Sequence, residues 1–147
     1  MRAAAFCWSV VALLLTGCIK LDVKPIPAGE QAGVRYTTLR PLQLYGAYGE
    51  YPAKTITWYF LSIEGIANRY HTFIGAVPAG TELEIVDQLD RAALGLPHSR
   101  IYRVRLRPGA VGSFGDDLVH LGGPPRLLQK NPDGTVELSR DFFRRID

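Results

Sequence analysis

Cysteine is the residue type that this sequence most clearly lacks. The 147 residues include two cysteines, Cys7 and Cys18, and both lie near the N-terminus. Residues 19–147 therefore contain no internal disulfide, no cysteine-based metal site and no thiol nucleophile. A chain of this size buries a substantial core without such staples, so its stability must come from packing.

Charge of one sign and clustered histidine are also missing. Lys and Arg number 17 and Asp and Glu 14, a formal net charge of +3, which is too small a surplus to favour nucleic acid as a partner. The three histidines, His71, His98 and His120, are far apart and follow none of the spacings used by metal sites. We therefore predict a protein that is not an enzyme and that uses neither a metal nor a cofactor.

No apolar run is long enough to cross a bilayer as a helix, which needs roughly 20 residues. The run over residues 3–15 follows the basic Arg2 and ends at the small pair Thr16-Gly17, and Lys20 and Asp22 come soon after. A positive start, an apolar middle and small residues before a cleavage point are the layout of a secretory signal peptide. The sequence therefore predicts a signal peptide at residues 1–17.

The end of this run, Leu15-Thr16-Gly17-Cys18, resembles the lipobox of bacterial lipoproteins. In that family the signal is cut before the cysteine, whose sulfur receives a diacylglycerol and whose new amine is usually acylated, with palmitate for example. The resemblance implies that Cys18 is lipidated and that two or three acyl chains hold the protein firmly at a membrane. In the enteric-type system Asp after the cysteine retains the protein at the inner membrane, so Ile19 implies the outer membrane, facing the periplasm.

The mature chain divides into a tether and one domain. Pro25, Pro27, Gly29 and Gly33 interrupt any regular pattern, which predicts that residues 18–33 form a flexible tether behind the lipidated cysteine. Residues 34–147 are the right size for a single domain.

Short runs of β-branched and aromatic residues, separated by glycine and proline, predict strands throughout this domain. Apolar and polar residues alternate most clearly in residues 81–87 and 101–107, as in a sheet with one wet face. This pattern predicts an all-β fold, a small SH3-like barrel or sandwich. The predicted strands cover residues 34–39, 42–48, 55–63, 69–76, 81–87, 99–107, 127–130 and 135–138.

Three local patterns add detail. Asn131-Pro132-Asp133-Gly134 predicts a turn that joins the last two strands as a hairpin. Residues 90–94 are compatible with one or two helical turns or with a plain loop. Residues 139–146 predict a short C-terminal helix, with Ser139 as N-cap and arginines in its last turn.

The segment Val77-Pro78-Ala79-Gly80-Thr81-Glu82-Leu83-Glu84-Ile85-Val86 resembles part of bacterial SH3-like domains. The shared pattern is a proline, a small residue and Gly-Thr, followed by an alternating strand. The resemblance covers this segment alone, and it implies a small barrel.

Tyr45, Tyr48 and Tyr51 recur at every third residue on a glycine-rich stretch. A strand alternates by two, so this spacing predicts a bend, on which the rings could form a platform for a peptide or a sugar. The alternative is that they pack at the rim of the domain beside Trp58 and Phe60.

Arg103, Arg105 and Arg107 would form a row on one outer face, next to Glu82 and Glu84 of a neighbouring strand. Cross-strand ion pairs are the simpler interpretation. The alternative is a site for a phosphate or carboxylate, from a lipid headgroup or a peptidoglycan peptide.

These observations predict a membrane-anchored bacterial envelope lipoprotein. Its domain would be a non-catalytic binding or structural module for an envelope protein or a cell-wall partner such as peptidoglycan. The alternative is an inhibitor or immunity-type protein that blocks a periplasmic hydrolase. Neither hypothesis involves nucleic acid.

Overall fold

Nearly all of the regular structure is β-strand, as the sequence predicted. The computed structural model describes residues 22–49, 55–92, 99–112, 114, 118–122 and 126–146. Within them the only helical element is the 3-10 turn η1 (Gly29–Gln31). The strands are β1 (Asp22–Ile26), β2 (Arg35–Thr38), β3 (Leu42–Tyr48), β4 (Ile56–Ser62), β5 (His71–Val77), β6 (Glu82–Ala92), β7 (Ser99–Leu106), β8 (Leu118–Leu121), β9 (Leu128–Lys130), β10 (Val136–Leu138) and β11 (Phe143–Ile146).

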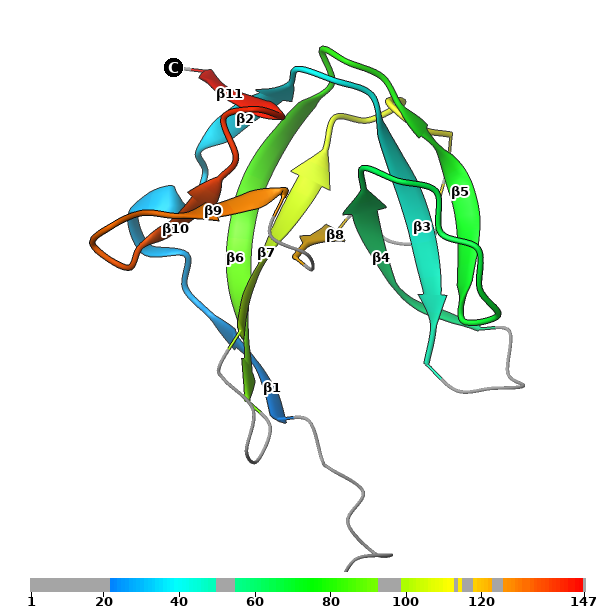
Figure 1. Ribbon diagram of the computed structural model, residues 1–147, viewed down its shortest axis with the longest axis horizontal. Coiled ribbons are helices and arrows are strands. Elements are labelled where there is room, and N and C mark those ends of the chain that lie inside the picture. The colour runs from blue at the N-terminus through cyan, green and yellow to red at the C-terminus, as the bar shows by residue number, and fades with distance from the viewer. Residues whose placement is uncertain are drawn as a thin grey trace, which may run out of the picture.

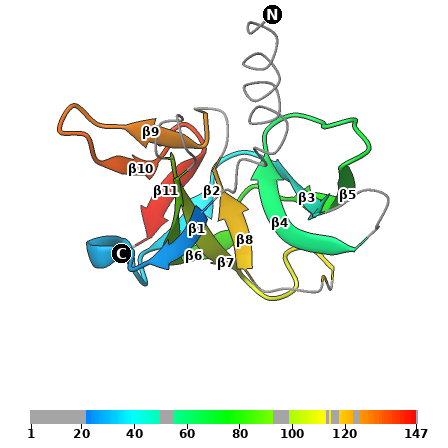
Figure 2. The same cartoon turned by 90° about the horizontal axis from the view of Figure 1, so that it is seen from below.

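Nine of these strands form one sheet in the order β11-β2-β6-β7-β8-β4-β3-β5, and β1 pairs with the far end of β6. All pairs are antiparallel except β4 with β8, which is parallel. The sheet curves, so that β6 and β7 lie on one side of the molecule and β4, β3 and β5 on the other, with β8 between them (Figure 1). The hairpin β9–β10 stands apart from β3–β5 (Figure 2).

The sheet is open. Its end strands, β11 and β5, do not pair with each other in the described part of the chain. The barrel that the SH3-like resemblance implied is therefore wrong, and the sandwich alternative fits. One core lies inside the curve. Strands from both halves of the curved sheet supply its buried side chains, such as Ile85, Val104, Val119, Leu44 and Leu61.

Two segments contain strands where the sequence predicted other structure: the C-terminal segment, predicted as a helix, and the N-terminal tether, predicted as flexible. The predicted C-terminal helix is wrong: Ser139 O accepts hydrogen bonds from the N–H groups of Phe142 and Phe143, which makes a single turn, and the chain then continues as β11. Pairing with β2 places the Phe143 side chain in the core opposite Thr38, with 2% of its surface exposed. Tertiary pairing thus overrides the local helical pattern.

The predicted flexible tether is also wrong in part, because residues 22–26 form β1 and pair with residues 88–92 of β6. Pro25 is tolerated because β1 has a partner on one side only among the described residues. The same pairing keeps β6 extended through residues 90–92, for which helical turns were one alternative. Residues 18–21 and 93–98 lie outside the described residues.

The predicted hairpin is confirmed. The N–H of Asn131 donates to Thr135 O at 2.8 Å, and Gly134 closes the turn with a φ of 86°, which suits glycine. Hydrogen bonds from the Thr135 hydroxyl and backbone N–H hold the pKa of Asp133 below its ordinary value. The Tyr102 hydroxyl, on β7, donates to Val136 O at 2.7 Å and so ties the hairpin to the sheet.

Candidate functional site

One row of side chains crosses the outer face of the sheet. Direct cross-strand pairing brings together residues from six strands, which lie far apart in the sequence. The row begins with charged groups and ends with aromatic rings. In order it consists of Asp87 on β6, Arg103 on β7, His120 on β8, Phe60 on β4, Tyr45 on β3 and Phe73 on β5.

The arginines predicted as a binding surface lie at the charged end. Arg103 makes a two-point ion pair with Asp87, in which its Nε lies 2.6 Å from Oδ1, and both side chains are largely buried. Asp87 is a partner that the sequence did not reveal, because a register shift between Ile85 and Asp87 brings it opposite Arg103.

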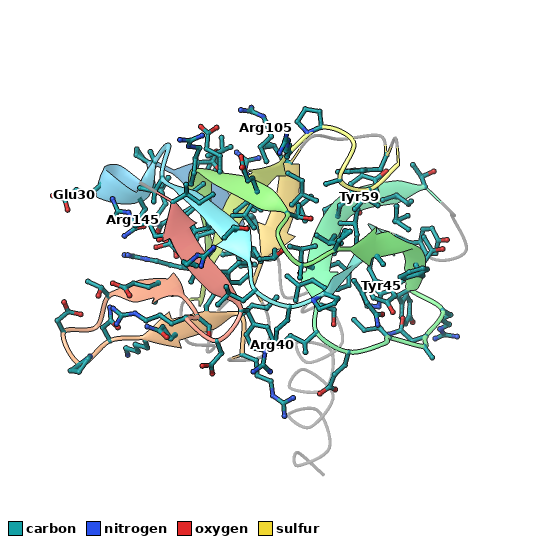
Figure 3. The ribbon with its side chains drawn as sticks, turned by 90° about the horizontal axis from the view of Figure 1, so that it is seen from above. Glu30, Arg40, Tyr45, Tyr59, Arg105 and Arg145 are labelled. Carbon is teal, nitrogen blue, oxygen red and sulfur yellow. The ribbon has the colours of Figure 1, made fainter. Side chains whose placement is uncertain are left out.

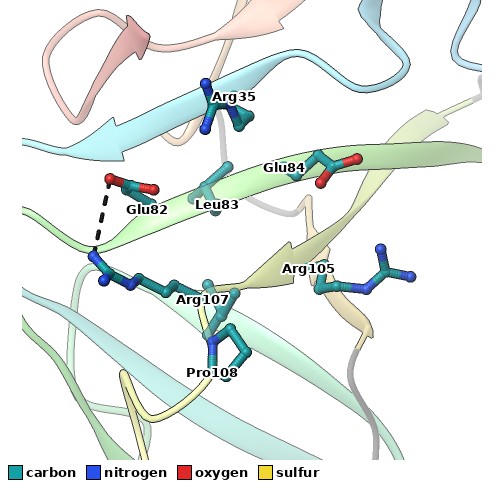
Figure 4. Close-up of a pocket in the computed structure, with 8 residues that line it drawn as sticks. Arg35, Glu82, Leu83, Glu84, Arg105, Arg107 and Pro108 are labelled. Carbon is teal, nitrogen blue, oxygen red and sulfur yellow. Dashed lines mark ion pairs between the residues drawn. The ribbon is translucent and has the colours of Figure 1, made fainter.

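Arg105 and Arg107 lie beside the predicted glutamates. Glu84 is paired in register with both Arg35 of β2 and Arg105 of β7, and Arg107 Nη1 lies 4.0 Å from Glu82 Oε1 (Figure 4). These five residues, which we name the charged half of the outer face, line a shallow pocket of about 150 Å³. Their signs alternate across the strands, so the ion-pair interpretation fits better than a dedicated anion site.

The predicted tyrosines do not lie together as a platform in the described residues. Tyr45 is 4% exposed, whereas Tyr48 is half-buried and its N–H donates to Tyr70 O; Tyr51 lies outside the described residues. The stretch bends through two register shifts within β3, at Leu44/Tyr45 and Ala47/Tyr48.

The glycines of this stretch serve close packing. A Cβ at Gly46 would lie 2.7 Å from Ile56 Cδ1, and one at Gly49 would lie 2.6 Å from Thr57 Cγ2. Both contacts are with side chains at the start of β4. The glycines therefore let β4 pack closely on β3.

Tyr45 is buried because the chain crosses over it. Strands β4 and β5 pair antiparallel with opposite edges of β3, so residues 63–70, which we name the crossover segment, must pass across β3. The Tyr45 hydroxyl accepts a hydrogen bond from the Ile66 N–H at 2.9 Å and donates to Gln43 Oε1 at 2.7 Å. Tyr45 therefore holds the crossover segment in place (Figure 3).

Aromatic rings pack around Tyr45. Its ring stacks on Phe60 with centroids 5.8 Å apart and meets the edge of Phe73 at 5.7 Å, and Phe60 also contacts His71 at 5.1 Å. We name these four residues the aromatic half of the outer face. Phe73 remains 56% exposed, whereas the others are covered to a greater extent.

A pocket of about 440 Å³ opens beside this aromatic half. Strand β4 contributes to its lining, one wall is the crossover segment, and Gly122, Arg126 and Leu127 form the other wall. Pockets of this volume with a mainly apolar lining are typical small-molecule sites. The lining residues are Phe60, Leu61, Ser62, Ile63, Glu64, Gly65, Ile66, His71, Gly122, Arg126 and Leu127.

Two charged side chains join the walls of this pocket. Arg126 Nη1 lies 2.7 Å from Glu64 Oε1, and the two side chains are 65% and 72% exposed. His71, another lining residue, has its Nδ1 2.8 Å from Asn68 Oδ1, which also accepts a hydrogen bond from the Tyr70 N–H. Sequence reasoning missed this pocket, because only the crossover and the parallel β4–β8 pair bring its walls together.

No family model, no curated protein and no solved structure matches this chain. Among the described residues, no three His, Cys, Asp or Glu side chains are grouped so that they could hold a metal ion. No helix within the described ranges is both long and apolar enough to cross a membrane.

Proposed function

We propose that the protein is a lipid-anchored component of the bacterial envelope whose β-sheet domain binds a ligand without catalysis. The observation that carries the proposal is the motif Leu15-Thr16-Gly17-Cys18, directly after an apolar run that begins near Arg2. Cys18 is the anchor in this proposal, and Ile19 favours the outer membrane, facing the periplasm.

The pocket beside the aromatic half supports the binding role. Its volume of about 440 Å³ lies in the range of ligand sites, and Phe60, Ile63 and Ile66 give it an apolar lining. The Tyr45 hydroxyl accepts a hydrogen bond from the Ile66 N–H, which helps to fix one wall of the pocket before a ligand binds. Pre-formed sites bind at a lower cost in conformational entropy.

Metabolic labelling tests the anchor. In cells grown with an alkynyl fatty acid, the wild-type protein should become labelled and fractionate with the outer membrane. Cys18→Ser should lose the label and leave the outer-membrane fraction, because the acylated sulfur is gone. Labelling is read by attaching a fluorophore to the alkyne and comparing bands on a gel.

The chain offers a matched control in its only other cysteine. Cys7→Ser removes a thiol from the predicted signal peptide and should leave both labelling and fractionation unchanged. Equal labelling of wild type and Cys18→Ser would contradict the proposal, as would loss of label in Cys7→Ser.

A further inference from the structure

The pocket beside the aromatic half has opposite charges on its two walls. Glu64 belongs to the crossover segment and Arg126 to the chain before β9, sixty-two positions apart in sequence and 2.7 Å apart between Oε1 and Nη1. Both line the pocket. A ligand that enters here therefore meets one carboxylate and one guanidinium side by side.

Exposure varies with depth in this pocket. Leu61 and Leu127 are 2% and 5% exposed, whereas Glu64 and Arg126 are mostly exposed. The two leucines are therefore more deeply buried than the charged pair, which lies at the surface of the pocket. A fitting ligand has an apolar body for the buried part and polar groups for the surface.

The Glu64–Arg126 pair determines which charges a ligand should carry at the surface of the pocket. An anion that approaches Arg126 also meets the carboxylate of Glu64, and a cation that approaches Glu64 also meets the guanidinium. A ligand with both charges satisfies the two side chains together and leaves neither without a counter-charge. From this complementarity we infer that the pocket binds a zwitterion with an apolar body, its anionic group on Arg126 and its ammonium group on Glu64.

Opening the pair to admit such a ligand costs little. Exposed ion pairs contribute little to stability, because water solvates both partners when they separate. The ligand then replaces one charge-assisted contact by two. The inference deepens the proposed binding role and rests on it.

Two sources supply this chemistry: a free amino acid with an apolar side chain, and a zwitterionic phospholipid headgroup such as phosphatidylethanolamine. Both place an ammonium near an anionic group and carry an apolar part. The lipid composition of the membrane in which the protein is tested distinguishes them.

Three probes with one apolar body test the charge requirement. Phenylalanine carries both charges, N-acetyl-phenylalanine only the negative one, and phenylalaninamide only the positive one. The whole lipidated protein, held in nanodiscs of phosphatidylglycerol, is titrated with each by calorimetry. Phenylalanine should bind about tenfold more tightly than either single-charge probe, because each of those loses a charge-assisted hydrogen bond.

Matched variants locate the site. Glu64→Gln and Arg126→Gln should each weaken phenylalanine binding by about tenfold while their melting temperatures stay near that of wild type. Glu82→Gln and Arg107→Gln alter the exposed ion pair of the charged half and should leave binding unchanged. Replacing half of the phosphatidylglycerol by phosphatidylethanolamine should weaken phenylalanine binding if the lipid is the source, and should not if the source is a free amino acid.

Three results would overturn the inference: no binding of phenylalanine, equal binding of all three probes, or an equal loss in the Glu64 and Glu82 variants. Each of these results can be distinguished from a failure of the lipid-anchor proposal. Fatty-acid labelling at Cys18 reports on the anchor alone and does not depend on the pocket.

Discussion

The charged half and the aromatic half occupy the same outer face of one sheet, yet they are built differently. In the charged half, Arg35, Glu84 and Arg105 are neighbours in register; the two arginines are exposed and Glu84 is partly exposed. In the aromatic half, the crossover segment covers Tyr45 and bonds to its hydroxyl. Charged side chains need no cover, whereas a large aromatic surface is stabilised by being removed from water.

The difference has a consequence for binding. The charged half offers a shallow pocket of about 150 Å³, whereas a pocket of about 440 Å³ opens beside the aromatic half. The segment that buries Tyr45 also forms one wall of the larger pocket. The proposed binding pocket therefore arises where the chain covers an aromatic surface, and the two halves should respond differently to substitution.

The largest effect is expected at Tyr45. Tyr45→Ala removes a ring that contacts Phe60 and Phe73, together with the hydroxyl that bonds to Ile66, and should lower the free energy of unfolding by about 3–5 kcal/mol. Urea denaturation of the whole chain in detergent measures it. Tyr45→Phe keeps the ring and should cost only about 1–2 kcal/mol. A loss below 1 kcal/mol for Tyr45→Ala would show that the ring is an exposed platform after all.

A smaller effect is expected at the charged end of the cross-strand row. Asp87→Ala removes the two-point partner of the largely buried Arg103 and should cost about 1.5 kcal/mol. Glu82→Ala is the matched control, since it removes the distant and exposed partner of Arg107 and should cost less than about 0.5 kcal/mol. Equal losses in the two variants would remove the distinction between the row and the charged half.

The smallest effect concerns Tyr102, whose side chain lies in the core beneath β7, at alkaline pH. Burial raises the pKa of Tyr102, so the folded state favours the neutral phenol. The neutral phenol therefore contributes fully to the stability of the fold below about pH 10. This contribution is lost as the pH rises through the pKa of the folded state. Tyr102→Phe loses one hydrogen bond, at about 1 kcal/mol near neutral pH. Melting curves above pH 10 should then fall less steeply for Tyr102→Phe than for wild type.

Much of the strand pattern could be predicted because it depends on neighbouring residues. Strand β3 has the predicted bounds, and Leu83 and Ile85 point inward while Glu84 points outward, as their alternation indicated. The turn at Gly134 could also be predicted, because a left-handed conformation at that position favours glycine. These features require no knowledge of the rest of the chain.

The strands that were not predicted, β1, β11 and β8, have a shared cause. Residues 22–26 and 143–146 contain weak strand signals, and each became a strand by pairing with a longer one, β6 or β2. Strand β8, which no local pattern indicated, lies between β7 and β4. Unpaired backbone groups must find partners when buried, and the partner that is near in space decides the outcome.

The sequence by itself determined the all-β class, the alternation of buried and wet positions, and the motif on which the anchor proposal rests, because each depends on residues close together in the chain. Only the tertiary structure decided that the sheet stays open, that Tyr45 is covered, and that Glu64 meets Arg126. Those features depend on which distant strands pair and on where the chain crosses β3. Strand pairing is a long-range choice that local periodicity does not encode.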